Sequence, residues 1–390
     1  MDALESALRD WRRHLHRHPE FGFEEHATAR FVAEKLRSFG ITDVAEGVGD
    51  TGVVATLRLG SGPRSIALRA DMDALRIPEQ TNLPYASATP GVMHACGHDG
   101  HTAILLGAAR VLSRLAARHP LPRPVTLVFQ PAEEGGAGGK RMVEEGALDG
   151  SRIGPKVEEI YALHGWPELP LGTVATRRGA VMAASDRFEI HVHGRGSHAA
   201  WPHRSADPIV CASAIVTALQ SVVARNVDPL DAAVVSVTIM EAGSAFNVIP
   251  DRAAIKGTYR SLSEDTRSML ERRMKEVAEG VAAAHGCTVR ADFHRIYPVT
   301  VNDDGAVARF ESVARDTFGP ERVGTLAAPV MGGEDFAFYG AHVPSCYWAL
   351  GLAPGGAPFP PLHAPDFDFN DDAIAVGVEL MCRLAVRVTA

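Results

Sequence analysis

Residues 65–73 read SIALRADMD, a short apolar run that leads directly into acidic residues. Comparable runs at 52–59 (GVVATLRL), 125–130 (VTLVFQ) and 160–165 (IYALHG) are typical of buried strands in a mostly parallel sheet. Between them, HTAILLGAARVLSRLAAR (101–118) has the apolar spacing of a packed helix. Further helices are expected at 3–17, 25–39, 304–317 and 371–388. This alternation of strands and helices predicts a layered α/β domain.

After Arg178 the pattern changes to strand, helix, strand, strand, helix, strand. These elements are expected at 186–194, 207–225, 232–243, 253–261, 263–286 and 287–296. Ser263 is a suitable N-cap for the second helix, and Gly286 is expected to end it. The order βαββαβ is that of a ferredoxin-like sandwich. We therefore expect an α/β domain in two parts, residues 1–179 and 295–390, with a smaller domain inserted at 180–294.

Length and composition narrow the class of protein. With 390 residues the chain exceeds the size of most single hydrophobic cores, so two domains are expected. The net charge of -8 argues against non-specific binding to nucleic acid or to an anionic membrane. No apolar run approaches the roughly 20 residues that span a bilayer, and MDALESALRDWRRHLHRHPE (1–20) has no apolar signal core. We expect a cytoplasmic protein whose five scattered cysteines are reduced.

Residues 93–101 (MHACGHDGH) carry the densest group of potential metal ligands. Cys96 and His98 lie there among further imidazoles and a carboxylate, a ligand set that suits ions such as Zn²⁺, Mn²⁺, Co²⁺ or Ni²⁺. One alternative is a histidine-rich loop held by structural hydrogen bonds. Another is a cysteine hydrolase, because a cysteine beside a histidine is also the signature of a thiol nucleophile. Such an enzyme would survive removal of metal by a chelator.

Other expected strands also lead into ligand-type residues. VTLVFQ is followed by Glu133 and Glu134, IYAL by His164, and SIALRA by Asp73. Ligands of open α/β sheets bind beyond the carboxyl ends of the strands, so these side chains are expected at one rim. Adjacent acids usually lie on a solvated face, but this pair follows a buried strand and precedes GGAGG (135–139), which leaves room for a ligand. One carboxylate can bind metal while its neighbour takes a proton from an activated water.

Two candidate groups lie later in the chain. His363 is part of a Pro-rich loop (PPLHAPDFDF, 360–369), and its local sequence alone favours an ordinary loop residue. His198 lies among glycines and small residues in HVHGRGSHAAWPH (191–203), so it can be exposed. Together with Asn247 and Arg260 it can bind a carboxylate and polarise a carbonyl. The alternative is a structural loop and a surface arginine.

Ten motifs, in order, resemble one known family. They are LHRHPEFGFEE (15–25), RADMDAL (69–75), MHACGHDGHTA (93–103), FQPAEEG (129–135), ALHGWP (162–167), GRGSHAAWPH (194–203), AFNVIPD (245–251), GTYR (257–260), GGEDFAFY (332–339) and LHAPDF (362–367). Over essentially its whole length the chain resembles the aminoacylase/carboxypeptidase-like family of co-catalytic metallopeptidases. More narrowly it resembles the amidohydrolase subgroup, which includes hippurate hydrolases, indole-acetyl-amino-acid hydrolases, N-acyl-amino-acid deacylases and N-acetyl-diaminopimelate deacetylases.

The resemblance implies a mostly parallel-sheet metallopeptidase domain with two divalent metal ions per subunit. The implied ligands are Cys96, His98, Glu134, His164 and His363. Cys96 resembles the bridging ligand, where other branches use an aspartate. Glu133 resembles the general base, and Asp73 resembles the carboxylate of the family's H-x-D motif that supports a ligand. That motif reads D-M-D here, with Asp71 in place of the histidine, as is typical of the amidohydrolase subgroup.

The inserted domain resembles the family's lid domain, which commonly carries the dimer contact. His198 resembles the lid histidine that reaches the partner's active site in dimeric members. Asn247 and Arg260 resemble residues that contact substrate, and they point to a free carboxylate on it. We therefore expect a homodimer that binds a small N-acyl amino acid.

The expected activity is cleavage of the amide bond of an N-acyl amino acid, hippurate-like or N-acetylated, to a carboxylic acid and a free amino acid. The expected cofactors are Mn²⁺, Zn²⁺, Ni²⁺ or Co²⁺, and the sequence leaves the metal, the acyl group and the amino acid open. The nearest alternative is a dipeptidase or aminopeptidase of the same family, which would normally keep the histidine that Asp71 replaces. A ligand-binding or scaffold protein that has lost its chemistry is the alternative from another class.

Overall fold

The computed structural model describes residues 2–58, 60, 62–355 and 359–387. The chain folds into two compact units. The first unit comprises residues 1–181, 301–328 and 335–390, and the second comprises residues 182–300 and 329–334. The long segment of the second unit, residues 182–300, therefore begins two residues and ends six residues after the inserted domain predicted at 180–294. Residues 329–334 also pack with the second unit, which the sequence did not indicate. Each unit has its own apolar core.

The first unit is built around a large sheet with the strand order β1-β2-β4-β3-β5-β16-β6-β15. Its strands are β1 (Val44–Val48), β2 (Gly52–Leu57), β3 (Ser65–Asp71), β4 (Val125–Gln130), β5 (Val157–Pro170), β6 (Val174–Thr176), β15 (Val323–Thr325) and β16 (Ser345–Ala353). The central strands β4, β3, β5 and β16 run parallel, as their continuous apolar sequences predict. β2 pairs antiparallel with both β1 and β4, so this run belongs to the antiparallel edge of the sheet.

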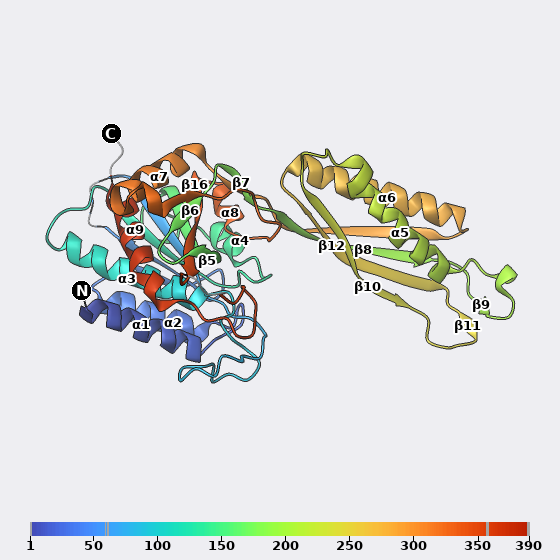
Figure 1. Cartoon of the computed structure of the whole chain (residues 1–390), viewed down its shortest axis with the longest axis horizontal. Helices are drawn as coiled ribbons and strands as arrows, with labels where there is room; N and C mark the ends of the chain where they lie inside the picture. Colours follow the sequence, from blue (N-terminus) through green and yellow to red (C-terminus); the bar gives the residue numbers. More distant parts are fainter. Residues whose placement is uncertain (1, 59, 61, 356–358, 388–390) are drawn as a thin grey trace. The chain divides into compact units, whose positions relative to one another are not determined.

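Helices cover this sheet. They are α1 (Asp2–Arg17), α2 (His26–Ser38), α3 (His98–Ala116), α4 (Gly138–Glu144), α7 (Asp304–Phe318), α8 (Ala337–Gly340) and α9 (Ile374–Val386), with the 3₁₀ turns η2 (Pro320–Arg322) and η3 (Asp371–Ala373). α3 packs against β3, α1 and α9, so the helices from the two ends of the chain lie beside it (Figure 1). α3 begins at His98 and not at the predicted His101, because Gly97 takes a φ of 86° and forms its N-cap. Residue 388, the predicted end of the last helix, lies outside the described residues.

The second unit has the βαββαβ order that the sequence predicts. Its main elements are β8 (Ala184–His193), α5 (Pro208–Asn226), β10 (Ala233–Ala242), β12 (Arg252–Ser261), α6 (Glu264–Ala284) and β13 (Thr288–Tyr297). The antiparallel sheet order β10-β12-β8-β13 is the connectivity of a ferredoxin-like sandwich. The hydroxyl of Ser263 accepts a hydrogen bond from the N–H of Thr266, as expected of an N-cap.

One face of this second sheet is covered and the other is open. α5 and α6 pack on the sheet beside each other (Figure 1). Phe188, Ile190 and Val192, alternate residues of β8, are buried beneath them. The intervening Arg187, Glu189 and the other odd-numbered residues of the strand are only partly buried or exposed. Since side chains alternate across a strand, the second face carries the polar set.

Smaller elements complete the chain. β7 (Gly179–Met182) pairs with β14 (Thr300–Asn302), β9 (Ser197–His198) pairs with β11 (Val248–Ile249), and η1 (Pro202–Arg204) follows β9. Within the described residues, α5 alone is long and apolar enough to cross a membrane, by length and composition only. Its Cys211, Ile215 and Leu219 side chains lie in the core of the second unit, which accounts for much of that apolar character.

Candidate metal centre

Three neighbouring strands of the large sheet bring candidate ligands to one edge. β4, β3 and β5 are adjacent and parallel, and the last residue of β3 lies opposite the last residue of β4. Asp73 follows β3, Glu133 and Glu134 follow β4, and His164 lies within β5. Parallel strands end at the same edge of a sheet, so residues far apart in the sequence meet there.

The five predicted metal ligands form two triplets that share one residue. Ligand atoms of Cys96, His98 and His164 lie within 4.8 Å of one another, and so do those of Cys96, Glu134 and His363. The Sγ atom of Cys96 is 3.3 Å from Nε2 of His164. Cys96 therefore stands between the two triplets, which is the position that a bridging ligand requires.

Asp73 forms hydrogen bonds with two of these predicted ligands, His98 and Glu134. Nδ1 of His98 lies 3.0 Å from the carbonyl oxygen and 3.1 Å from Oδ1 of Asp73, so its N–H donates to this residue. Oδ2 of Asp73 accepts a hydrogen bond of 2.9 Å from the backbone N–H of Glu134. In the part of the chain that the structure describes, the buried Nε2 of His98 has no hydrogen-bond partner. This nitrogen is therefore free to bind another group.

The donors present fit a divalent transition metal ion. Sulfur, imidazole nitrogen and carboxylate oxygen are ligands that such ions accept together. A buried ring nitrogen without a hydrogen-bond partner is unusual. Oδ2 of Asp71 lies 3.8 Å from His98 Nε2, beyond hydrogen-bond reach, and a metal ion would supply the partner that this nitrogen lacks. Burial by itself would lower the pKa of His98, but Asp71, Asp73 and Glu134 outweigh it and raise this pKa to about 10. The same negative potential favours a bound cation.

The surroundings of Cys96 disfavour a role for its thiol as a nucleophile. Burial, reinforced by the carboxylates of Glu134 and Glu133, raises the pKa of the Cys96 thiol well above its usual range. A catalytic cysteine needs the opposite, a cationic environment that lowers its pKa. The thiolate here would be stabilised by a bound metal ion, so the arrangement disfavours the cysteine-hydrolase alternative.

His363 reaches the centre through an uncommon backbone conformation. Its φ of 66° lies in the left-handed region, which residues with a Cβ atom rarely adopt. Its N–H donates to the carbonyl oxygen of Ala95 at 2.8 Å, and its Nε2 lies 3.2 Å from Oε1 of Glu134. The His363 side chain is 51% exposed, whereas His98 and His164 are buried. The centre is thus most accessible on the His363 side.

Glu133 lies beside the ligands and outside both triplets. Its side chain is buried, and one of its oxygens lies within 4.8 Å of ligand atoms of His98 and Glu134. The backbone N–H of Asp335 donates to Oε1 of Glu133 at 3.4 Å. A carboxylate held at this place can take up a proton next to a bound metal ion.

A buried polar layer supports these residues. Arg69 donates to Asp71 at 2.7 Å and to Asp335 at 3.1 Å. His101 donates from Nδ1 to Asp71 at 2.6 Å and accepts at Nε2 from the N–H of Gly165 at 2.8 Å. Sequence reasoning assigned no role to Arg69, His101 or Asp335. An arginine inside an apolar strand was nonetheless a signal, because a buried cation requires acidic partners.

The three remaining candidate residues lie in the second unit and separate into two places. His198 on β9 pairs with Val248 on β11, and the N–H of Ala199 donates to the carbonyl oxygen of Asn247 at 2.9 Å, so His198 and Asn247 are neighbours. Arg260 lies near the other end of β12, eight residues beyond Arg252, or about 26 Å at the rise of a strand. Within one chain these three side chains therefore cannot bind one carboxylate together, contrary to the expectation drawn from the sequence.

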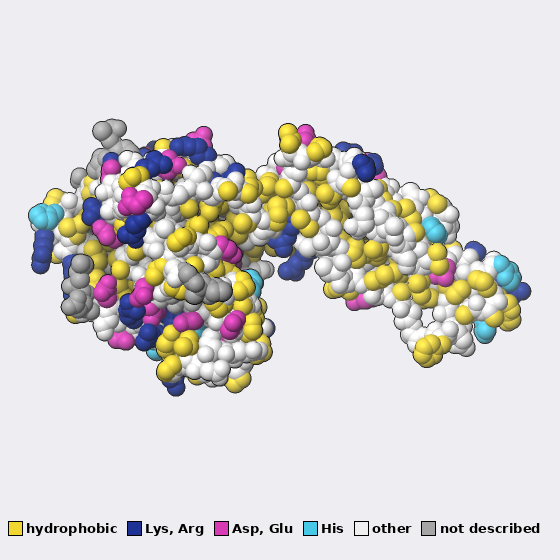
Figure 2. All heavy atoms as spheres, viewed as in Figure 1, with side chains coloured by type: hydrophobic (Ala, Val, Ile, Leu, Met, Phe, Trp, Pro, Cys, Tyr) yellow, Lys and Arg dark blue, Asp and Glu magenta, His cyan; other side chains and the backbone are white. Residues whose placement is uncertain are grey.

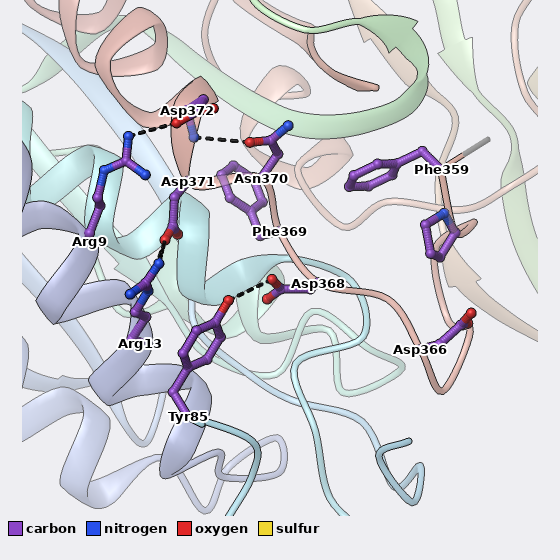
Figure 3. A pocket seen from close by; sticks show the side chains of 11 residues that line it. Arg9, Arg13, Tyr85, Phe359, Asp366, Asp368, Phe369, Asn370, Asp371 and Asp372 are labelled. Carbon is purple, nitrogen blue, oxygen red and sulfur yellow. Dashed lines mark hydrogen bonds and ion pairs between the residues drawn. The ribbon is translucent and has the colours of Figure 1, made fainter. Parts of the chain in front are cut away.

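A surface pocket of about 310 Å³ in the first unit lies apart from these ligands. Both arginines that line it are paired with acids of the same pocket (Figure 3): Arg9 pairs with Asp372 at 2.7 Å, and the Nε of Arg13 donates to Asp371 at 2.9 Å. None of the five predicted ligands lines this pocket. It is therefore not a competing candidate for the metal centre.

Known proteins match this chain over nearly its whole length. Residues 67–387 match the family described as peptidase family M20/M25/M40. The chain is 40% identical to hippurate hydrolase of Campylobacter jejuni, over 98% of this chain and 97% of that protein. It is 39% identical to N-acetylcysteine deacetylase of Bacillus subtilis, over 99% and 98%. A solved structure of a dinuclear metal-binding peptidase of the M20 family from Bacillus subtilis superposes with a TM-score of 0.85, at 35% identity over 99% of this chain and 98% of that chain. The chain therefore belongs to peptidase family M20/M25/M40, as its motifs implied.

Proposed function

We propose that this protein is a metal-dependent amidohydrolase that cleaves N-acyl amino acids to a carboxylic acid and a free amino acid. The observation that carries the proposal is the pair of ligand triplets sharing Cys96, with the buried carboxylate of Glu133 beside them. Full-length similarity to a hippurate hydrolase and an N-acetylcysteine deacetylase supports the choice of N-acyl amino acids as the substrate class.

In this proposal each triplet holds one divalent ion. Cys96, His98 and His164 would hold one ion, and Cys96, as a shared thiolate, would hold the other together with Glu134 and His363. When bound, the ions polarise the scissile carbonyl and activate a water molecule. Mn²⁺, Zn²⁺, Ni²⁺ and Co²⁺ all suit a mixed sulfur, nitrogen and oxygen ligand set.

The side chains of the protein carry the proton and position the reactants. Glu133 takes the proton of the attacking water and passes it to the leaving nitrogen, while Asp73 keeps His98 and Glu134 in place. We assign His198 to stabilisation of the oxyanion and Asn247 and Arg260 to substrate binding. Since His198 and Asn247 lie far from Arg260 within one chain, a second copy of the chain is the natural source of one of these groups.

A hydrolysis panel tests the proposal. Benzoyl-glycine, several N-acetyl amino acids and a matching dipeptide are incubated with protein loaded with each metal and with protein treated with a chelator. We expect metal-dependent release of free amino acid from the N-acyl compounds and little cleavage of the dipeptide. Preferential cleavage of the dipeptide would favour a peptidase, and activity that survives the chelator would revive the cysteine-hydrolase alternative.

A paired substitution tests the role of Glu133. Glu133→Gln should lower kcat by a factor of about 10²–10⁴, which is typical of the loss of a general base, or by more. The metal content should stay unchanged. Glu144→Gln is the matched control, since Glu144 also belongs to an adjacent pair of acids but is exposed, and among the described residues its ion-pair partner is Lys140 at 3.2 Å. Near-normal turnover in metal-loaded Glu133→Gln would refute the assignment.

We propose a homodimer formed through the second unit. β10 is an edge strand of its sheet, and Ile239 and Met240 on it are 47% and 44% exposed. Exposed residues of α5 include Ile209 and Val210, and hydrophobic and uncharged side chains dominate the visible surface over this helix (Figure 2). An open edge strand beside an apolar helix face is a common site for pairing of two copies.

Light scattering tests this assembly. We expect the mass of a dimer for the wild type and a shift toward monomer for Ile239→Lys, which places a charge on the β10 edge. Leu115→Lys is the control, because Leu115 is a comparably exposed apolar residue (37%) on α3 of the first unit. A monomeric wild type would contradict the proposed assembly.

A further inference from the structure

A further surface pocket of the first unit lies where α3 packs against α1 and α2. Its volume is about 380 Å³, within the range of about 300–1,000 Å³ that is typical of small-molecule sites. The pocket is lined by residues of α1, the end of α2 and α3: Trp11, Lys35, Ser38, Phe39, Arg110 and Arg114. None of the predicted metal ligands is among them, so the pocket is separate from the metal centre.

Every charged residue that lines this pocket is a cation. Lys35 and Arg110 are half-buried, and Arg114 is exposed. Among the described residues, no acid or other group forms a hydrogen bond or ion pair with the charged groups of these three side chains. Asp10 and Glu34, which directly precede lining residues in the sequence, do not line the pocket. The pocket is thus a local concentration of unpaired positive charge in a chain whose net charge is -8.

Nearby cations that serve the fold are paired with acids. Arg37, two residues after Lys35 on α2, lies 2.6 Å from Glu46. Arg9 and Arg13 on α1 are likewise paired with acids. The cations of the pocket differ from these neighbours, because no contact within the described part of the chain balances their charge.

The end of α2 does not require Lys35 as a cap. A lysine in the last turn of a helix can donate to the terminal carbonyl oxygens. Here the carbonyl oxygens of residues 35, 36 and 37 each accept a hydrogen bond from a backbone N–H group of residues 39–41. The ammonium group of Lys35 is therefore available to a ligand.

The indole ring of Trp11 positions two of the cations. Nζ of Lys35 lies 5.1 Å and Cζ of Arg110 lies 5.6 Å from the centre of this ring. Cation–π contacts of this kind restrict a long side chain but leave its charge in place. Arg110 and Arg114 are also four residues apart on α3, a spacing at which like charges repel each other. An anion bound between the cations would relieve this repulsion.

We propose that this pocket, which we call the cationic pocket, binds a small phosphate-bearing anion. A phosphate ester carries about 1.5–2 negative charges at neutral pH and three acceptor oxygens, which suits several cations that converge from different helices. A guanidinium offers paired N–H donors to phosphate oxygens, and an ammonium group binds phosphate as a point charge.

This ligand is distinct from the substrate of the proposed hydrolysis. Arg110 lies twelve residues after His98 along α3, or about 18 Å at the rise of a helix. An anion in the cationic pocket is therefore too far from the metal centre to be the group that is cleaved there. The inference stands whether or not the proposed function is correct.

NMR spectroscopy of the Zn²⁺-loaded protein tests the site, because the indole N–H signal of Trp11 reports on the pocket itself. The chain has four tryptophans, and Trp11→Phe identifies the signal that belongs to Trp11. Inorganic phosphate and a sugar phosphate are titrated at constant ionic strength. We expect either probe to cause a saturable shift of the Trp11 signal. Tighter binding of the sugar phosphate would identify the ligand as an ester, and equal binding would identify it as free phosphate.

Substitutions in the cationic pocket test which groups bind the anion. Lys35→Gln and Arg110→Gln should each raise the dissociation constant about tenfold, as expected for the loss of one charge-assisted hydrogen bond. Arg37→Gln is the matched control, because Arg37 is exposed on the same helix but already paired with Glu46, and its dissociation constant should equal that of the wild type.

Three results would overturn the proposal. The first is the absence of a saturable Trp11 shift, which would also be seen if phosphate bound only at the metal ions. The second is an equal shift with acetate at the same ionic strength, which would indicate general screening of charge. The third is an unchanged dissociation constant in both Lys35→Gln and Arg110→Gln.

Discussion

Replacement of Asp73 by asparagine should weaken metal binding without unfolding the protein. Asp73 is almost fully buried, and its two carboxylate oxygens serve different donors. Oδ1 accepts from Nδ1 of His98 at 3.1 Å, and Oδ2 accepts from the backbone N–H of Glu134 at 2.9 Å. Asparagine keeps the shape but has one oxygen and one NH₂ group. One of the two donors would then face another donor.

The expected loss of metal affinity follows from that mismatch between two hydrogen-bond donors. Leaving one buried donor unpaired costs about 1–3 kcal/mol. If most of this cost appears in the metal-bound state, the metal dissociation constant rises about 10–100-fold, which matches the usual effect of changing a group that orients a metal-bound histidine. The carbonyl oxygen of Asp73, 3.0 Å from His98 Nδ1, survives the substitution and sets the lower end of this range.

Metal affinity is measured by competition with a chromophoric chelator, and circular dichroism checks that the variant is folded. The control is Asp149→Asn, which changes a nearly fully exposed carboxylate that accepts a hydrogen bond from the N–H of Ser151 at 2.8 Å. A folded Asp73→Asn variant whose affinity stays within about twofold of the wild type would refute the reasoning.

Two further predictions concern stability. Burial would lower the pKa of His16, but hydrogen bonds to Asp99 (2.8 Å) and Glu79 (3.3 Å) raise it to about 9. The protonated ring therefore adds about 3 kcal/mol to the free energy of unfolding below pH 6.5, and this contribution is lost as the pH rises through 9. Urea unfolding between pH 6 and 10 should show the loss in the wild type and not in His16→Gln. Parallel pH curves for the two proteins would contradict the prediction. Arg267→Met leaves the buried Asp186 carboxylate without its cationic partner and should lower the free energy of unfolding of the second unit by about 3–5 kcal/mol, with partial recovery in the double variant Asp186→Leu/Arg267→Met; equal stability of the single variant and the wild type would count against the ion pair.

Local sequence predicted the parts of the centre that depend on local rules. The short apolar runs before Asp73 and Glu133 predict buried parallel strands, and parallel strands end at the same edge of a sheet. Both residues follow such strand ends and therefore lie at that edge. The starting residue of α3 was missed, because the left-handed Gly97 that caps it could equally have been a loop glycine. This shift has a consequence, since it places His98 in the first turn of the helix, where its ring can reach Asp73.

Other features depend on long-range packing. His363 reaches Glu134 only because its backbone takes a φ of 66°, and nothing in its Pro-rich surroundings specifies that conformation. The separation of Arg260 from His198 depends on the length and register of β12, which the sequence could not relate to the loop that carries His198. The sequence also assigned β2 to a mostly parallel sheet without indicating its antiparallel pairing, which is set by the topology of the whole domain.

The pairing of β5 with β16 has a consequence for how the chain acquires its structure. Ile160 lies opposite Ser345, so the centre of the large sheet is completed only after the whole second unit has been synthesised. Loop closure costs more entropy as the loop lengthens, and a prefolded unit between the strands shortens the flexible part of that loop. Most of the second unit is one continuous segment, residues 182–300, and can fold before the strands meet. Pulsed hydrogen exchange during refolding should therefore protect amides of β8 and β12 before those of β16. The inserted unit would then serve the chain first as a folding intermediate and only later as a part of the enzyme.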